Sequence, residues 1–310
     1  MPSDCRETII FIRWALFRLT IWLPYLWLLL FFLTPFLLIA KLSLSKSVMA
    51  QPPYIPTFAW DDTIQGWWKK IQELSFKNFI FIIEDHLYWK SYLSSLKIAA
   101  LSTVLTLFIG YPLAYGMSQA PQTIRTMLLM LVILPFWTSF LIRVYAWIAI
   151  LKKEGLLNQF LIWFGVISEP LIILNTNIAV YIGIVYSYLP FMVLPLYANL
   201  ARQDQVFLEA ASDLGCTPFR AFWKITWPLS LPGIIAGSLL VFIPTVGEFV
   251  IPSLLGGSET LMIGQILYDE FFQNRDWPIS CAVAVILLLI LIIPIRFLQR
   301  IEAIDRKKSS

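Results

Sequence analysis

Residues 206–228 read VFLEAASDLGCTPFRAFWKITWP and form a polar segment between two long apolar runs, 177–200 and 231–255. Gly215 is placed to end one short helix and Pro218 to begin another, because glycine is favoured just after a helix and proline in its first turn. Pro228 then predicts the end of the second helix. The segment is therefore expected to be a compact helix–turn–helix that projects from a membrane.

Apolar runs of spanning length recur along the chain. Crossing a hydrocarbon core of roughly 30 Å takes about 20 apolar residues in a helix. The sequence predicts an all-α, polytopic membrane protein with six spans, at 20–40, 95–117, 126–150, 177–200, 231–255 and 279–298. A shorter apolar stretch, 155–167, repeats leucine and phenylalanine at helical spacing. It is expected to be a helix lying against the bundle or the membrane interface.

The composition supports a membrane protein and argues against several other classes of protein. Hydrophobic residues make up 59% of the chain and charged residues 14%, whereas soluble domains carry about 25% charged residues. One histidine and three scattered cysteines offer no metal site of known spacing. No phosphate-binding loop of the G-x-x-x-x-G-K-[ST] or G-x-G-x-x-G kind occurs, so we expect no nucleotide or other cofactor in this chain. The basic residues are dispersed, which argues against nucleic acid as a partner.

The distribution of Lys and Arg predicts the orientation of the chain in the membrane, because these residues are enriched on the cytoplasmic side of membrane proteins. With a cytoplasmic amino terminus, the two short outer loops hold only Lys152, Lys153 and Arg275. The inner segments then hold Arg6, Arg13, Arg18, Arg125, Arg202, Arg220, Lys224, Arg296, Arg300, Arg306, Lys307 and Lys308. Both termini are therefore expected to be cytoplasmic.

The remaining outer loop, 41–94, is long and mixed in charge. It contains Pro52 and Pro53 and then a cluster of three tryptophans, Trp60, Trp67 and Trp68. Tryptophan is enriched at the headgroup level of membranes. The loop is expected to form an interfacial helix, with a surface for docking a partner as the alternative.

The polar segment 206–228 carries the residue pattern E-A-A-x3-G-x9-I-x-x-P, formed by Glu209, Ala210, Ala211, Gly215, Ile225 and Pro228. This pattern resembles the EAA motif of permease subunits of ABC importers, with Trp227 at a position where leucine is usual. The resemblance implies a type I ABC importer permease (MetI-like) fold. It also implies that these six residues form the coupling helices that sit in a groove of a cytoplasmic ATPase.

Other stretches narrow the resemblance to polyamine permeases. They are LPFWTSFLIRVY at 134–145, GIVY at 183–186, LPFMVLPLY at 189–197, PGIIAGS at 232–238 and NRDWP at 274–278. The likeness runs from about 92 to 294. Within this family, FIPTVGEFVIP at 242–252 is similar to the putrescine branch, since the spermidine/putrescine branch usually has an apolar residue where this chain has Glu248.

The resemblance implies a machine of several subunits in a bacterial inner membrane. It would pair this chain with a second homologous permease and join both to an ATPase dimer, which binds ATP and Mg. A periplasmic polyamine-binding protein would deliver the substrate. The chain then divides into a cytoplasmic segment (1–19), a transmembrane permease domain (20–298) and a cytoplasmic tail (299–310). The permease domain includes the periplasmic loop 41–94 and the coupling loop 201–228.

Glu248 is a charged residue in the middle of a predicted span. A charged side chain near a helix centre is disfavoured by roughly 2.5–3.5 kcal/mol on insertion scales, so it is expected to face the bundle or a wet cavity. There it could attract a diamine dication. The alternatives are a structural ion pair with Arg143 or Lys97, or a position close to the water on the outer side. Trp137, Tyr186 and Tyr188 could offer ring faces to an ammonium group, with plain packing as the alternative.

Small residues and prolines give the remaining expectations. Gly233 and Gly237 have the small-x3-small spacing that lets helices approach closely. Pro135, Pro190 and Pro244 interrupt spans and mark either static kinks or gates.

The function expected from the sequence is a transport subunit with no catalytic residue of its own, since no hydrolase or metalloprotease motif occurs. The substrate is expected to be putrescine. Two alternatives stay open at this point. One is a permease for spermidine or another small cationic solute, and the other is a stand-alone secondary transporter, whose transport would not depend on ATP.

Overall fold

The computed structural model describes residues 20–57, 64–204 and 206–308. The predicted cytoplasmic segment 1–19 and Trp60 lie outside these residues. The chain divides into two compact units, one formed by residues 1–82 and 270–286 and the other by residues 83–269 and 287–310. Within these residues the fold is helical, as the sequence predicts, apart from one two-stranded hairpin that the sequence did not predict.

The first unit begins with an apolar helix over Thr20–Ser43, which includes a π-helical turn, η1 (Leu29–Leu33), and α2 (Thr34–Ser43). Strands β1 (Lys46–Ser47) and β2 (Tyr54–Ile55) then pair antiparallel, with Lys46 opposite Ile55. Helices α3 (Ile64–Gln72) and α4 (Lys77–Glu84) follow. The Asn78 side chain donates hydrogen bonds of 2.8 Å to the carbonyls of Ser43 and Ser45, which fastens α4 to the end of the first helix.

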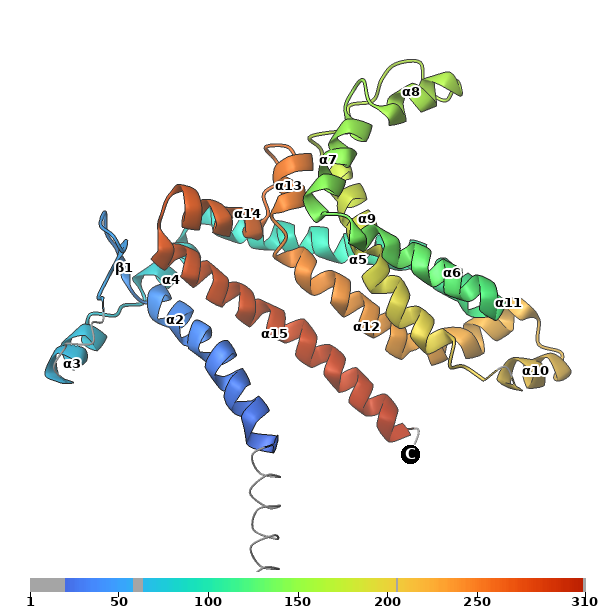
Figure 1. Ribbon diagram of the computed structural model, residues 1–310, viewed down its shortest axis with the longest axis horizontal. Coiled ribbons are helices and arrows are strands. Elements are labelled where there is room, and N and C mark those ends of the chain that lie inside the picture. Colours follow the sequence, from blue (N-terminus) through green and yellow to red (C-terminus); the bar gives the residue numbers. More distant parts are fainter. Residues whose placement is uncertain (1–19, 58–63, 205, 309–310) are drawn as a thin grey trace, which may run out of the picture. The chain divides into compact units, whose positions relative to one another are not determined.

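The second unit is built around three long helices that pack together, α5 (His86–Gln119), α9 (Asn177–Leu200) and α12 (Trp227–Val246) (Figure 1). The shorter helices around them are α6 (Gln122–Ile133), η2 (Leu134–Trp137), α7 (Phe140–Leu151), α8 (Leu156–Trp163), α10 (Val206–Asp213), α11 (Pro218–Ala221), η3 (Phe222–Thr226), α13 (Val250–Leu255) and α14 (Ile263–Tyr268). The last elements of the chain are η4 (Asp269–Gln273) and α15 (Trp277–Lys308).

Buried apolar side chains form two clusters in this second unit. One joins α5, α7, α9 and α13 through residues such as Ile98, Val144, Ile184 and Ile251. The other joins α5, α9 and α12 through Tyr111, Met192, Leu196, Ile234 and Val241. These two clusters fix the relative positions of the helices that carry the candidate site.

Five helices within the described residues are long and apolar enough to cross a membrane, at Thr20–Ser43, His86–Gln119, Asn177–Leu200, Pro218–Val246 and Trp277–Arg296. A sixth crossing is counted if the bent pair Gln122–Trp137 and Phe140–Trp163 is one span. The range 177–200 predicted from the sequence is reproduced by α9. The second predicted span begins earlier, at His86, because the Asp85 carboxylate caps that helix by accepting from the Leu87 amide at 2.8 Å.

The prediction of one continuous span at 126–150 was wrong. The chain bends by 92° between the two halves of this region. Pro135 has no amide hydrogen to continue an α-helix, and Thr138 and Ser139 adopt extended backbone angles after the short 3₁₀ turn η2. The shorter stretch at 155–167 does contain the predicted helix, α8.

The predicted span at 231–255 is also broken. α12 ends at Val246, and α13 starts at Val250, so Glu248 lies in the connection and not inside a continuous helix. The predicted helix stop at Pro228 was wrong as well, because helical structure runs from Pro218 to Val246. The π-helical turn η3 just before it uses an i to i+5 bond, from the Trp227 amide to the Phe222 carbonyl, and places Pro228 at the start of α12.

Candidate functional site

The segment 206–228 folds into α10, a tight reversal, α11 and η3, which agrees with the predicted helix–turn–helix. Gly215 has a φ of +76°, a backbone conformation that glycine adopts without strain. The Gly215 amide donates to the Ser212 carbonyl at 2.9 Å, and the Cys216 amide donates to the Ala211 carbonyl at 2.9 Å. These two bonds are the Schellman pattern that closes the carboxyl end of a helix.

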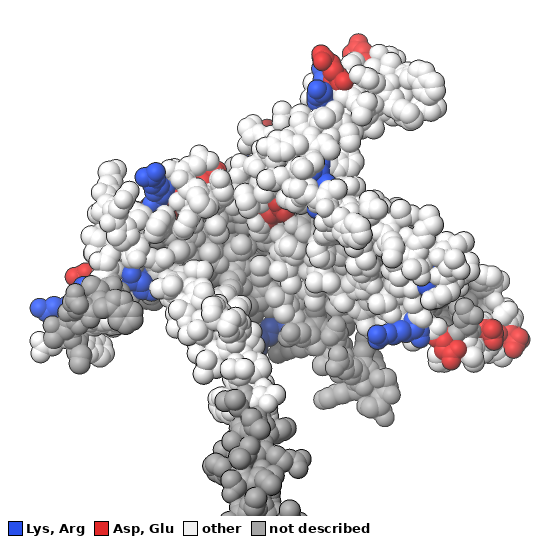
Figure 2. Space-filling view, viewed as in Figure 1, with Lys and Arg blue, Asp and Glu red and all other residues white. Residues whose placement is uncertain are grey.

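The EAA residues lie on different faces of this segment. Glu209, Ala210 and Pro228 are exposed, Ile225 is half-buried, and Ala211 is buried. Large apolar side chains are exposed beside them, led by Leu214 at 88% and Phe219 at 74%, with Phe207 and Trp223 half or more exposed. Charged side chains gather at this end of the unit in Figure 2. The exposed apolar side chains were missed from the sequence, and their alternation with charged residues is the signal that could have found them.

Glu248 is buried, with 8% of its surface exposed, and its carboxylate is held by three donors. The Tyr188 hydroxyl donates to Oε2 at 2.5 Å, and the amides of Val250 and Ile251 donate to Oε1 at 3.0 and 3.4 Å. The carboxylate thus caps the first turn of α13, where backbone amides point outward and favour negative charge.

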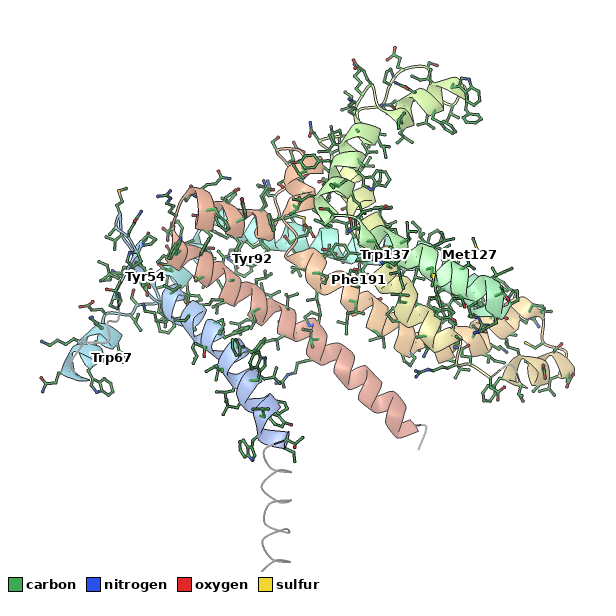
Figure 3. All side chains as sticks on the ribbon, in the orientation of Figure 1. Tyr54, Trp67, Tyr92, Met127, Trp137 and Phe191 are labelled. Carbon is green, nitrogen blue, oxygen red and sulfur yellow. The ribbon has the colours of Figure 1, made fainter. Side chains whose placement is uncertain are left out.

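A pocket of about 420 Å³ opens beside this carboxylate. Its walls come from η2, α7, α9 and the connection between α12 and α13, and they include Phe136, Phe140, Tyr188, Phe191 and Glu248. The Phe136 and Phe191 rings meet edge to face at 5.2 Å. Figure 3 shows Phe191 on α9 and Trp137 at the neighbouring turn. One carboxylate among aromatic rings is a setting that favours an organic cation.

The structure brings together two of the four residues that the sequence predicts as possible substrate contacts, which are Glu248, Trp137, Tyr186 and Tyr188. Glu248 and Tyr188 share a hydrogen bond and line the pocket. Trp137 is 86% exposed and is not part of the pocket wall, and Tyr186 packs edge to face on Trp147 at 5.3 Å. Phe136, Phe140 and Phe191 were missed, because aromatic residues are too abundant in this chain for their sequence positions to stand out.

The ion pair considered for Glu248 does not form within the part of the chain that the structure describes. The Arg143 guanidinium instead lies over the rings of Phe136 and Phe140, at 5.2 and 5.7 Å from their centroids. Its Nε and Nη1 atoms are buried without a hydrogen-bond partner among the described residues. The Tyr188 hydroxyl and the two α13 amides therefore stabilise the Glu248 carboxylate, which the ion pair would otherwise have done.

Gly233 and Gly237 lie where α12 crosses α9. A Cβ atom at Gly233 would come within 2.8 Å of the Asn199 Cβ, and one at Gly237 would come within 2.8 Å of the Met192 sulfur. Both distances are shorter than van der Waals contact, so the two helices approach more closely than any larger side chain would allow.

The protein family described as "Binding-protein-dependent transport system inner membrane component" matches residues 107–307. The chain belongs to this family. It is therefore an inner-membrane transport subunit and not an enzyme. A stand-alone secondary transporter, which the sequence left open, does not agree with membership of a binding-protein-dependent system.

Curated relatives place the chain near polyamine permeases. It is 40% identical over 244 residues to the spermidine/putrescine transport system permease protein PotB of Salmonella typhimurium strain SL1344, covering 77% of this chain and 85% of the relative. It is 42% identical over 225 residues to PotB of Escherichia coli K12, covering 71% and 82%. The expected resemblance to polyamine ABC permeases is confirmed.

Solved structures agree with the fold. A chain of a bacterial alginate ABC transporter in complex with an alginate pentasaccharide-bound periplasmic protein matches with a TM-score of 0.69, 16% identity and 94% of each chain covered. A chain of the MetNI methionine ABC transporter gives a TM-score of 0.53 at 18% identity, covering 69% of this chain and 94% of the other. These matches confirm the expected MetI-like permease fold.

Proposed function

We propose that this chain is a permease subunit of an ATP-driven importer that translocates putrescine across the inner membrane. The observation that carries the proposal is the buried Glu248 carboxylate on the wall of an aromatic pocket, in a chain that is 40% identical to a spermidine/putrescine permease. An ammonium group entering this pocket would meet one negative charge and several ring faces, and these together replace part of its lost hydration.

Tyr188 contributes by orienting the carboxylate. Its hydroxyl and the two α13 amides fix both oxygens of Glu248, so the charge is positioned before a substrate arrives. Trp137 and Tyr186 do not line the pocket in this structure. Their proposed contact with the substrate would therefore lie elsewhere along the pathway.

The finer choice of putrescine rests on the likeness of residues 242–252 to the putrescine branch. The second candidate is spermidine, which the names of the PotB relatives favour. The described wall of the pocket contains one carboxylate, Glu248. In a heterodimer, a second permease subunit would supply the contact for the other ammonium group of either polyamine.

We also propose that residues 206–228 couple the permease to its ATPase. The exposed apolar side chains Leu214 and Phe219 form a surface that water solvates poorly and that a protein groove would cover, and Glu209 beside them offers a carboxylate to a basic partner residue. ATP and Mg would bind to the ATPase dimer. This arrangement requires the coupling loop 201–228, the segment 1–19 and the tail 299–310 to be cytoplasmic, and the loop 41–94 to be periplasmic, where the polyamine-binding protein docks.

The test is uptake of labelled putrescine into proteoliposomes that contain the complete complex and its binding protein. ATP is supplied on either side of the membrane, with and without excess unlabelled spermidine. ATP-dependent uptake of putrescine that excess spermidine inhibits only weakly would support the putrescine permease. Equal competition would make the protein a general polyamine permease, and transport of neither compound would refute the polyamine assignment.

A further inference from the structure

Gly264, in the first turn of α14, lies directly against the backbone of the connection that carries Glu248. A Cβ atom at Gly264 would come within 2.3 Å of the Gly247 carbonyl oxygen and within 2.7 Å of the Glu248 carbonyl oxygen. Both oxygens belong to the backbone, so no rotation of a side chain could make room for that atom. Only glycine therefore allows α14 to approach residues 247–248 this closely.

Two hydrogen bonds hold the beginning of α14 and the loop before it. The Ile263 amide donates to the Ser95 hydroxyl of α5 at 2.7 Å, and the Thr260 hydroxyl donates to the Asn177 side-chain oxygen of α9 at 2.8 Å. Ile263 and Ser95 are both completely buried. Because a buried amide without an acceptor is costly, α14 cannot move away from α5 without a large loss of stability.

The other end of α14 contacts the same connection. The Tyr268 ring stacks on the Phe249 ring, with the centroids 4.9 Å apart and the planes 11° from parallel. Phe249 and Glu248 both line the aromatic pocket, whereas Gly264 does not line it within the part of the chain that the structure describes. Gly264 can therefore affect a substrate only through the pocket wall that α14 supports.

We propose that Gly264 is a positioning residue, which sets the place of the Glu248 carboxylate by letting α14 close against residues 247–248. With alanine at 264, the distance from Cβ to the Gly247 oxygen would have to grow from 2.3 Å to at least 3.0 Å, a displacement of about 0.7 Å. Since α14 is tied to α5 and α9, the connection is the part that moves. Binding groups must be held within about 0.5 Å of their productive place, so this shift is large enough to matter.

The effect on transport rests on the function proposed above, in which Glu248 attracts the polyamine, but the displacement of the carboxylate does not. The first test is therefore a structure of the complete complex that carries Gly264→Ala. We expect the Glu248 carboxylate to shift relative to the Tyr188 hydroxyl by at least about 0.5 Å from its place in the unmodified complex. An unchanged arrangement of these two groups, with α14 displaced instead, would overturn the proposal.

The second test is uptake of labelled putrescine per assembled complex, measured for Gly264→Ala with Glu248 present and with Glu248→Gln. With Glu248 present we expect uptake to fall about tenfold, because the misplaced charge loses most of its contact with the substrate. With Glu248→Gln the further loss should stay below about twofold, because no charge is left to position. Equal losses in the two backgrounds would overturn the proposal, since a merely structural defect acts independently of the charge.

Gly233→Ala is the matched control, because it also forces a Cβ atom against a neighbouring helix, at 2.8 Å from the Asn199 Cβ. Its effect on uptake should be the same within about twofold whether residue 248 is glutamate or glutamine. If Gly233→Ala depended on Glu248 as strongly as Gly264→Ala does, the special position of Gly264 would be refuted.

If Gly264→Ala does not assemble, two serines of α5 decide. Ser95→Ala removes the acceptor of the Ile263 amide, whereas Ser102→Ala removes an equally buried hydroxyl that has no hydrogen-bond partner among the described residues. With Glu248 present we expect Ser95→Ala to lower uptake about fivefold, the factor for one lost hydrogen bond, and Ser102→Ala to stay within about twofold of the unmodified protein. Equal effects of these two substitutions would overturn the proposal.

Failure of this proposal can be separated from failure of the proposed function. Unchanged uptake by Glu248→Gln would refute the role of Glu248 in transport, yet a displaced carboxylate in the Gly264→Ala structure would still support positioning by Gly264. Reduced uptake by Glu248→Gln together with normal uptake by Gly264→Ala would refute the positioning alone.

Discussion

Tyr188 on α9 and Glu248 in the connection between α12 and α13 are joined by a hydrogen bond of 2.5 Å from the tyrosine hydroxyl to the carboxylate Oε2. The bond links the middle of α9 to the connection between α12 and α13. Because Oε1 is bound by two amides of α13, both oxygens of the carboxylate are held. The charge is therefore fixed at the wall of the aromatic pocket.

Glu248→Gln is expected to lower putrescine transport at least tenfold at low substrate concentration, while complex assembly stays intact. Glutamine keeps the shape of the side chain but loses its charge, and a charge-assisted hydrogen bond is worth about 1.5–3 kcal/mol. The measurement is initial uptake rate in proteoliposomes, with the amount of assembled complex determined in parallel. Unchanged transport kinetics would leave Glu248 with a structural role only.

Tyr188→Phe is expected to reduce transport less than Glu248→Gln and to destabilise the subunit by about 1.5–3 kcal/mol, because one hydrogen bond to a buried carboxylate is lost. Tyr197→Phe is the matched control, since Tyr197 lies on the same helix α9 and is outside the pocket. Uptake kinetics and thermal unfolding in detergent check both variants. Equal effects of the two substitutions would contradict the special position of Tyr188.

Glu209→Lys is expected to leave membrane insertion intact and to abolish ATP-driven transport, because it reverses the charge on the exposed face of α10. Asp213→Lys makes the same change of charge one turn later on the same helix and serves as the control. Uptake by the Asp213 variant should remain well above that of the Glu209 variant. Normal uptake by Glu209→Lys would refute the coupling assignment.

Gly237→Ala is expected to destabilise the protein by about 1–3 kcal/mol, because the added methyl group would press on the Met192 side chain and backbone of α9. Gly116→Ala is the control, since Gly116 is also helical but a Cβ atom there meets nothing within 4 Å. Alanine should there be neutral or stabilising by up to about 1 kcal/mol. Thermal unfolding of the two variants side by side gives the comparison.

The sequence by itself determined that this is a helical membrane protein with several spans. Apolar runs of spanning length can only be solvated by lipid or by each other, so 177–200 was predicted with the bounds that α9 has in the structure. The reversal at Gly215 was also predicted correctly, because its φ of +76° is a local property that one glycine and its neighbours encode. The family followed from the resemblance of residues 206–228 to the EAA motif, and the comparisons confirmed it.

Only the tertiary structure decided where the spans break and which side chains meet. Glu248 was expected within a continuous helix, but α12 ends at Val246, and the Glu248 carboxylate accepts from the Val250 and Ile251 amides at the start of α13. The ion pair considered with Arg143 depends on distances between helices, which no local pattern encodes. The packing of α9 against α12 instead supplied Tyr188 as the partner of Glu248 and left Trp137 and Tyr186 outside the pocket. Sequence periodicity fixes which residues a helix contains, whereas close packing between helices fixes what each of those residues contacts.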